Sequence, residues 1–266
     1  MIENKNFFQP GAVRDPTYAH VRDEEHLSYE KEFVESLWPI YRPLADPHFR
    51  SDARNHFLQR FWEMYLACTL LERGLPLVRS GNEGPEFYFE FNRQRIWVEA
   101  IAPGAGSGPD HVLGIQRGEV HNVPEEQILL RFTAAICAKQ EKLESARAKG
   151  IVGLNEQMIL AINSRGIPGA PYRADMPYVV KALLPFGNLT VAIDPKTRGV
   201  TDSFHTYREE IRKANSSHVA TTAFLNPRFK SIVAVVHSGV DVANHPTRLG
   251  EEFVVVHNPS SLSDLS

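Results

Sequence analysis

Two glutamates in the segment 84–100, GPEFYFEFNRQRIWVEA, have the residue type and spacing to hold a cation. The segment has the pattern of two strands joined by a short polar turn. If residues 92–93 form a two-residue turn, Glu86 and Glu99 lie directly opposite each other. The same register gives pairs that sheets favour: Glu90 with Arg95, Tyr88 with Trp97, Phe89 with Ile96 and Phe87 with Val98. The sequence therefore predicts a hairpin that brings two carboxylates together.

Opposed like charges destabilise a sheet, so the acid pair needs an explanation. A cation could lie between the carboxylates, the two groups could share a proton, or a different register could turn both toward solvent. Mg²⁺ prefers oxygen ligands, commonly one or two carboxylates plus waters and phosphates, and would suit this pair. Without metal, the two acids should repel at neutral pH or one of them should have a raised pKa, and Glu99→Gln is expected to stabilise the metal-free protein.

A third acid and a lysine occupy unusual positions in two predicted helices. Residues 52–73 have helical spacing of apolar side chains, and Glu63 lies among them. It either needs a cation or donor in a buried site, or borders the polar stripe and pairs with Arg60. In the second predicted helix, 124–148, Lys139 falls on an otherwise apolar stripe. Its ammonium either reaches water along the helix surface or points to a charged site.

The order of these motifs resembles the PD-(D/E)XK nuclease superfamily. Glu63 in a helix, GPE opening a strand and WVEA in the next strand resemble the bacterial branch that reads helix–Glu, GPDF, then VWVEA. The resemblance covers about residues 57–139 and implies three acids around Mg²⁺ or Mn²⁺. Carried over, Glu63, Glu86 and Glu99 are the expected metal ligands and catalytic acids.

Two departures from the family pattern bear on activity. Glu86 replaces the usual aspartate, which keeps the charge and lengthens the side chain. The family places a lysine that polarises the attacking water two residues after the last acid, where this chain has Ile101. Either the lysine has migrated, with Lys139 as the candidate for the fourth catalytic residue, or the site is inactive.

The wider pattern predicts an α/β fold of the restriction-endonuclease-like kind, with a mixed sheet flanked by helices. We expect an N-terminal extension over residues 1–50, with one short helix around Tyr29–Trp38, and a PD-(D/E)XK-like domain over 51–266. Further strands are predicted at 157–163, 189–194, 219–225, 231–238 and 252–258, a short helix within 176–187 and a helix at 204–214.

Composition limits the classes of function. The chain has 266 residues, 42% of them hydrophobic, which is enough for one sizeable core. A net charge of -3 excludes a strongly basic DNA-coating protein but allows a local basic groove. Cys68 and Cys137 lack CxxC partners, which indicates reduced thiols and a cytoplasmic location.

The sequence shows no signal-peptide pattern and no apolar run of transmembrane length, so no membrane partner is expected. The expected function is Mg²⁺-dependent hydrolysis of DNA phosphodiester bonds, with DNA as partner. The alternative is a catalytically inactive, nuclease-like binding or regulatory protein.

Overall fold

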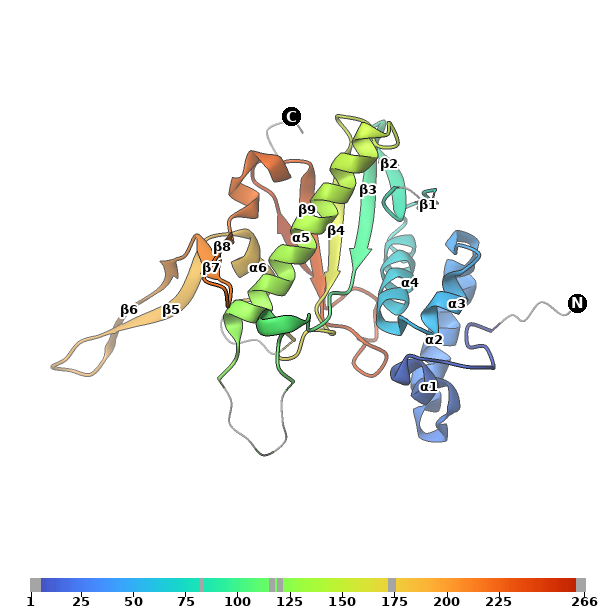
Figure 1. The fold of residues 1–266 in the computed structure, drawn as a ribbon, viewed down its shortest axis with the longest axis horizontal. Coiled ribbons are helices and arrows are strands. Elements are labelled where there is room, and N and C mark those ends of the chain that lie inside the picture. Colours follow the sequence, from blue (N-terminus) through green and yellow to red (C-terminus); the bar gives the residue numbers. More distant parts are fainter. Residues whose placement is uncertain (1–5, 82–83, 115–117, 119–121, 172–175, 262–266) are drawn as a thin grey trace, which may run out of the picture.

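A six-stranded mixed sheet forms the centre of the protein (Figure 1). The computed structural model describes residues 6–81, 84–114, 118, 122–171 and 176–261. The strands of the central sheet lie in the order β1-β2-β3-β4-β9-β10. They are β1 (Val78–Arg79), β2 (Phe87–Phe91), β3 (Gln94–Ile101), β4 (Gln157–Asn163), β9 (Ile232–Ser238) and β10 (Val254–His257). Strands β3, β4 and β9 are parallel, and the remaining neighbours pair antiparallel.

Helices cover both faces of this sheet, as expected. They are α1 (Pro16–Asp23), α2 (Ser28–Tyr41), α3 (Phe49–Ala53), α4 (Phe57–Glu72), α5 (Glu125–Ala148) and α6 (Tyr178–Leu183). Helix α4 packs with Val98 and Ala100 on one face, whereas α5 and α6 pack with Trp97 and Leu160 on the other. Because successive strand residues point to opposite faces, Glu99 belongs to the α5 face.

The predicted hairpin register is confirmed. Asn92 and Arg93 have positive φ values of 49° and 64°, the geometry of the type I′ turn that suits two-residue hairpins. Strands β2 and β3 pair from Phe91 opposite Gln94 to Phe87 opposite Val98. Glu86 comes directly before β2, one step beyond the last of these pairs.

Helix α5 provides the long crossover that parallel strands β3 and β4 require. It spans Glu125–Ala148, so the prediction of a helix over 124–148 is confirmed. Two acidic residues lie in its first turn, where their negative charges interact favourably with the positive end of the helix dipole. Its buried residues include Phe132, Ile136 and Leu143, which hold this helix against the sheet.

Residues 6–50 contribute to the core on the α4 side. Phe7, Tyr18 and Trp38 are buried in the same apolar cluster as Phe57 of α4. The helix expected around Tyr29–Trp38 is α2, and α1 and α3 accompany it. The Asp15 carboxylate accepts N–H groups from the first turn of α1 and from Phe57, and so ties the start of α1 to the start of α4. This segment therefore supports the helix that carries Glu63.

One helix prediction is correct only in part, and another is wrong. The helix expected over 52–73 is interrupted, because α3 ends at Ala53 and α4 begins only at Phe57. The segment 204–214 is not helical and contains strand residues instead. Its Phe-His-Thr-Tyr start favours a strand, and it pairs with the preceding strand.

Two small two-stranded sheets lie beside the central sheet. They consist of β5 (Phe186–Ile193) with β6 (Val200–Tyr207), and β7 (Glu210–Arg212) with β8 (His218–Ala220). The expected strands 157–163, 189–194, 231–238 and 252–258 correspond to β4, β5, β9 and β10. The strand predicted at 219–225 is confirmed only where it overlaps β8, because Ala223–Leu225 forms a short 3₁₀ helix.

Within the described part of the chain, every helix is too short or too polar to span a lipid bilayer.

Candidate active site

The hairpin places Glu86 and Glu99 in contact. The two carboxyl groups interact with each other, and Glu86 Oε2 accepts the N–H of Ala100 at 2.9 Å. The side chain of Glu99 is 1% exposed and that of Glu86 is 14% exposed. The two acids therefore form a mostly buried pair at the point where the hairpin strands stop pairing.

Two lysines of α5 bind this pair. Lys139 Nζ donates to Glu99 Oε1, so the prediction that this ammonium points toward the acids is confirmed. Lys142 Nζ donates to both oxygens of Glu99, at 2.8 and 3.1 Å, and lies 3.9 Å from Glu86 Oε1. We call Glu86, Glu99, Lys139 and Lys142 the acid–lysine cluster.

The two carboxyl groups have opposite pKa shifts. Burial raises the pKa of Glu86 well above its ordinary value of 4.5, and the charge of Glu99 and the hydrogen bond to it raise it further. Burial also opposes ionisation of Glu99, but the hydrogen bond from Glu86 and the two lysines outweigh it and lower the pKa of Glu99. The cluster therefore favours a shared proton, with Glu86 as the acid and Glu99 as the carboxylate.

This asymmetry corrects the expectation that removing the charge of Glu99 relieves repulsion. Glu99 is the carboxylate that both lysines stabilise, whereas Glu86 has the raised pKa. The relief of repulsion should therefore come from substitution of Glu86.

Glu86→Gln should change how stability depends on pH. The raised pKa means that the folded protein binds this proton more tightly than the unfolded chain. Stability is thus highest below pH 4.5 for this group and falls as pH rises toward the folded pKa. The stability of the variant should not fall in this way, and its free energy of unfolding near neutral pH should exceed that of wild type by about 0.2–1 kcal/mol. Urea unfolding in EDTA across pH 4–8 measures it.

Glu99 provides the internal control for that titration. Its lowered pKa contributes stability above pH 4.5 that is lost as pH falls below this value, so acid unfolding should remain in Glu86→Gln. If the free energy of unfolding of Glu86→Gln declines above pH 4.5 as much as that of wild type, another titrating group causes the decline.

Glu63 is buried, with 1% exposure, and has its own set of partners. Its Oε1 accepts Tyr41 Oη at 2.6 Å and Arg79 Nη1 at 2.8 Å, and its Oε2 accepts Arg60 Nη1 at 2.8 Å. Asp46 and Asp52 complete the arginine–glutamate network by binding the same two guanidinium groups. The pairing with Arg60 that the sequence allowed is therefore present.

The arginine–glutamate network lies close enough to influence the acid–lysine cluster. Burial lowers the pKa of Lys142, but the charges of Glu99 and Glu86, the hydrogen bond to Glu99 and the charge of Glu63 together raise it. The structure thus joins Glu86, Glu99 and Lys139, as the sequence predicted, while Glu63 binds two arginines nearby.

The donor set suits a metal ion with few protein ligands. Among the described residues, no three His, Cys, Asp or Glu side chains are arranged to hold a metal. Mg²⁺, however, is commonly held by one or two carboxylates and waters, which Glu86 and Glu99 can provide. Lys142 is 38% exposed, so its ammonium can leave Glu99 for solvent at low cost. The residues present therefore fit a two-carboxylate Mg²⁺ site.

Sequence reasoning missed Lys142 and Arg79. Lys142 follows Lys139 by three residues, and this spacing places both on one side of a helix, so a signal existed. No sequence signal marked Arg79, because it lies in a separate strand and contacts Glu63 only in the folded protein.

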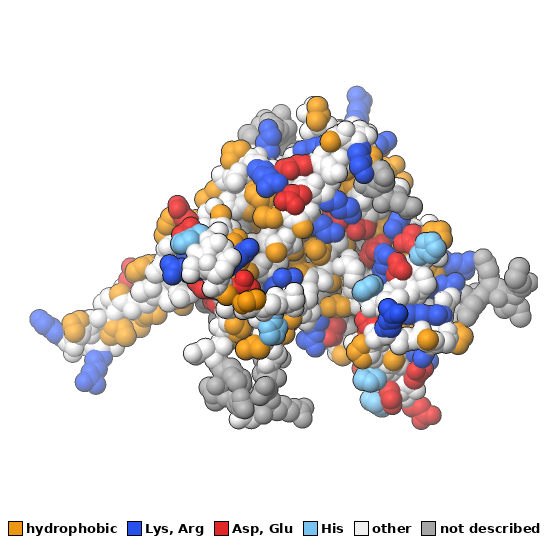
Figure 2. Space-filling model, viewed as in Figure 1, with side chains coloured by type: hydrophobic (Ala, Val, Ile, Leu, Met, Phe, Trp, Pro, Cys, Tyr) orange, Lys and Arg blue, Asp and Glu red, His pale blue; other side chains and the backbone are white. Residues whose placement is uncertain are grey.

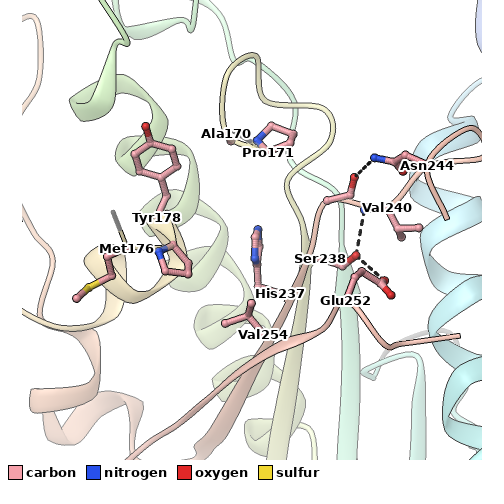
Figure 3. Close-up of a pocket in the computed structure, with 12 residues that line it drawn as sticks. Ala170, Pro171, Met176, Tyr178, His237, Ser238, Val240, Asn244, Glu252 and Val254 are labelled. Atoms are coloured by element: carbon pink, nitrogen blue, oxygen red, sulfur yellow. Dashed lines mark hydrogen bonds between the residues drawn. The ribbon is translucent and has the colours of Figure 1, made fainter. Parts of the chain in front are cut away.

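A cavity of about 360 Å³ lies elsewhere, near the ends of β4 and β9 (Figure 3). His237 points into it, and Ser238 Oγ donates to Glu252 Oε1 at 2.9 Å. Ser238 Oγ in turn accepts the N–H of Val240 at 3.0 Å. These polar groups hold one another in place, and the cavity shares no lining residue with the acid–lysine cluster. We therefore place the candidate chemistry at the cluster.

No family model, curated protein or solved structure matches this chain. The features of this chain that bear on function are therefore its short motifs and the geometry of the acid–lysine cluster.

Proposed function

We propose that this protein is a Mg²⁺-dependent nuclease that hydrolyses DNA phosphodiester bonds on a restriction-endonuclease-like fold. The observation that supports this best is the acid–lysine cluster, in which the hairpin brings two carboxyl groups together beside two lysines. An acid pair of this kind attracts a divalent cation, and the lysines attract a phosphate. The motif order around Glu63, GPE and WVEA agrees with this proposal.

Each residue of the cluster has a distinct part in the proposed reaction. Glu86 and Glu99 would hold Mg²⁺ or Mn²⁺, which when bound supplies a water of lowered pKa and neutralises phosphate charge. Glu86 would give up its proton on metal binding. Lys139, held at Glu99, would orient the attacking water or stabilise developing charge. Lys142 would leave Glu99 and bind a phosphate oxygen.

Glu63 would act on the site through its surroundings. Its bonds to Arg60 and Arg79 keep both guanidinium groups in place, and its charge favours the ammonium form of Lys142. This is a positioning part in place of the direct metal ligation that the resemblance implies.

A second candidate function is binding of nucleic acid without cleavage. Ile101 occupies the position where the family pattern has lysine. Both oxygens of Glu99 already accept lysine N–H groups, and both oxygens of Glu63 accept arginine N–H groups. These contacts would stabilise a site that no longer takes a metal.

One set of variants distinguishes these functions. Wild type should show a Mg²⁺-induced rise in melting temperature and Mg²⁺-dependent cleavage of a panel of single- and double-stranded DNA. Glu86→Ala should lose both signals. Lys139→Met should keep the rise in melting temperature while cleavage falls by about 100-fold. Thermal unfolding and gel assays with Mg²⁺ or EDTA measure these effects.

Glu90→Ala is the matched control, because Glu90 lies in the same strand, is exposed and pairs with Arg95. It should retain both signals. A metal-induced rise that persists in Glu86→Ala would contradict the metal site. Binding of DNA without cleavage under any metal condition would favour the second candidate function.

A further inference from the structure

Strands β5 and β6 form a two-stranded ribbon that projects from the body of the protein (Figure 1). Among the described residues, neither strand pairs with the central sheet, and neither edge of the ribbon has a further strand beside it. A two-stranded hairpin is marginally stable in water without further packing. The ribbon is therefore a feature that needs a partner surface.

One face of the ribbon carries a continuous row of apolar side chains. The pairs Leu189–His205, Val191–Ser203 and Ile193–Val200 lie on this face, because alternate residues point the same way. The register shift between residues 186 and 189 keeps the Phe186–Tyr207 pair on the same face, where Phe186 contacts the His205 ring edge-on at 6.0 Å. We call this set the apolar stripe: Phe186, Leu189, Val191, Ile193, Val200 and Tyr207.

The apolar stripe is open to solvent in the single chain. Its exposures range from 37% for Phe186 to 70% for Tyr207, and hydrophobic side chains extend along the ribbon in Figure 2. On the opposite face Thr190 and Ala192 are half-buried, whereas their strand partners Phe204 and Asp202 are exposed. A contiguous apolar area of this size on a monomer marks an interaction surface.

The chemistry of the apolar stripe excludes some partners. Within β5 and β6 its neighbours on the same face are Ser203 and His205, which are polar. The acid in contact with the stripe is Glu209 at the base, which accepts a hydrogen bond from the Tyr207 hydroxyl at 2.5 Å. A nucleic acid needs cations to replace its counterions, and none is present here. Basic residues lie at the two ends of the ribbon: Lys196 and Arg198 in the turn at the tip, and Arg208 at the base, where it donates to Phe186 O at 3.3 Å and to Glu125 at 2.8 Å.

The area and symmetry of the apolar stripe fit a second copy of the same chain. The stripe offers accessible area on the order of 600 Å², near the about 800 Å² per partner of a standard interface. Two identical uncharged faces can meet about a two-fold axis without opposed like charges. We infer that two chains associate through their β5–β6 ribbons, with the apolar stripes face to face, independently of the proposed function.

Analytical ultracentrifugation of the full chain tests this dimer. Wild type should shift from 30.0 kDa toward twice that mass over the micromolar concentration range. Val191→Lys places an ammonium in the middle of the contact and should raise the dimer dissociation constant by about 100-fold. Ile193→Lys, on the same stripe, should act in the same way.

Thr190→Lys is the matched control, since it adds the same charge one residue away on the opposite face. It should dimerise like wild type. Wild type that remains monomeric throughout, or equal dimerisation of the Val191→Lys and Thr190→Lys variants, would overturn the inference. Monomeric wild type that binds phosphatidylcholine–phosphatidylserine vesicles would instead assign the stripe to a lipid surface.

Discussion

Glu99→Gln should reduce the rate of metal-dependent cleavage by about 1,000-fold or more. It should also destabilise the metal-free protein by about 1–3 kcal/mol. The carboxylate is 1% exposed and binds the ammonium groups of Lys139 and Lys142. The neutral amide introduced at this position would bind the ammonium groups of Lys139 and Lys142 more weakly than the carboxylate does. Cleavage assays and urea unfolding in EDTA measure the two effects.

Glu86 lies close to Lys142 and should limit how much Glu99→Gln destabilises the protein. Its Oε1 lies 3.9 Å from Lys142 Nζ, so an ionised Glu86 can partly replace Glu99 as the partner. The double variant Glu86→Gln/Glu99→Gln should consequently lose more stability than Glu99→Gln alone. A Glu99→Gln protein more stable than wild type in EDTA would show that repulsion between the acids outweighs the lysine contacts.

Glu63→Gln should reduce the free energy of unfolding by about 3 kcal/mol. The substitution removes the charge that Arg60 and Arg79 share, each at 2.8 Å, from a side chain with 1% exposure. The estimate lies at the low end for a broken buried pair because these arginines remain 21% and 26% exposed. Urea unfolding in EDTA measures the loss, and Mg²⁺ affinity should change by less than about tenfold.

Glu72→Gln is the matched control, because Glu72 lies in the same helix but is exposed. Its effect should stay within about 0.5 kcal/mol. If Glu63→Gln instead abolishes Mg²⁺ binding while stability is unchanged, Glu63 is a direct ligand and the positioning role is wrong.

The elements with clear periodicity were the ones the sequence could predict. The β2–β3 register followed from cross-strand pairs and the length of one turn, and α5 followed from its apolar spacing and acidic first turn. The segment 204–214 was harder because its charged second half favours a helix, while pairing of Phe204–Tyr207 with β5 decides the structure. Pairing between distant segments overrode local propensity there.

The candidate site was predictable where its partners lie close in sequence. Glu86 and Glu99 belong to one hairpin, and Lys139 was marked by its apolar surroundings. The environment of Glu63 was only half predictable, since Arg60 is three residues away but Arg79 comes from β1. The direction of each pKa shift depends on burial and on Lys142, which only the fold supplies.

The two-residue turn at the tip of the β2–β3 hairpin has an evolutionary consequence. A single inserted residue there would either lengthen the turn or shift the pairing of β2 with β3 by one residue, and such a shift turns one acid to the other face of the sheet. Insertions and deletions in this turn should therefore be eliminated by selection in any lineage that needs both acids. Exchange of side chains at residues 92 and 93 should be restricted only to those that accept positive φ. For this hairpin, the length of the turn and the tolerance of positive φ at residues 92 and 93 are therefore the features under selection.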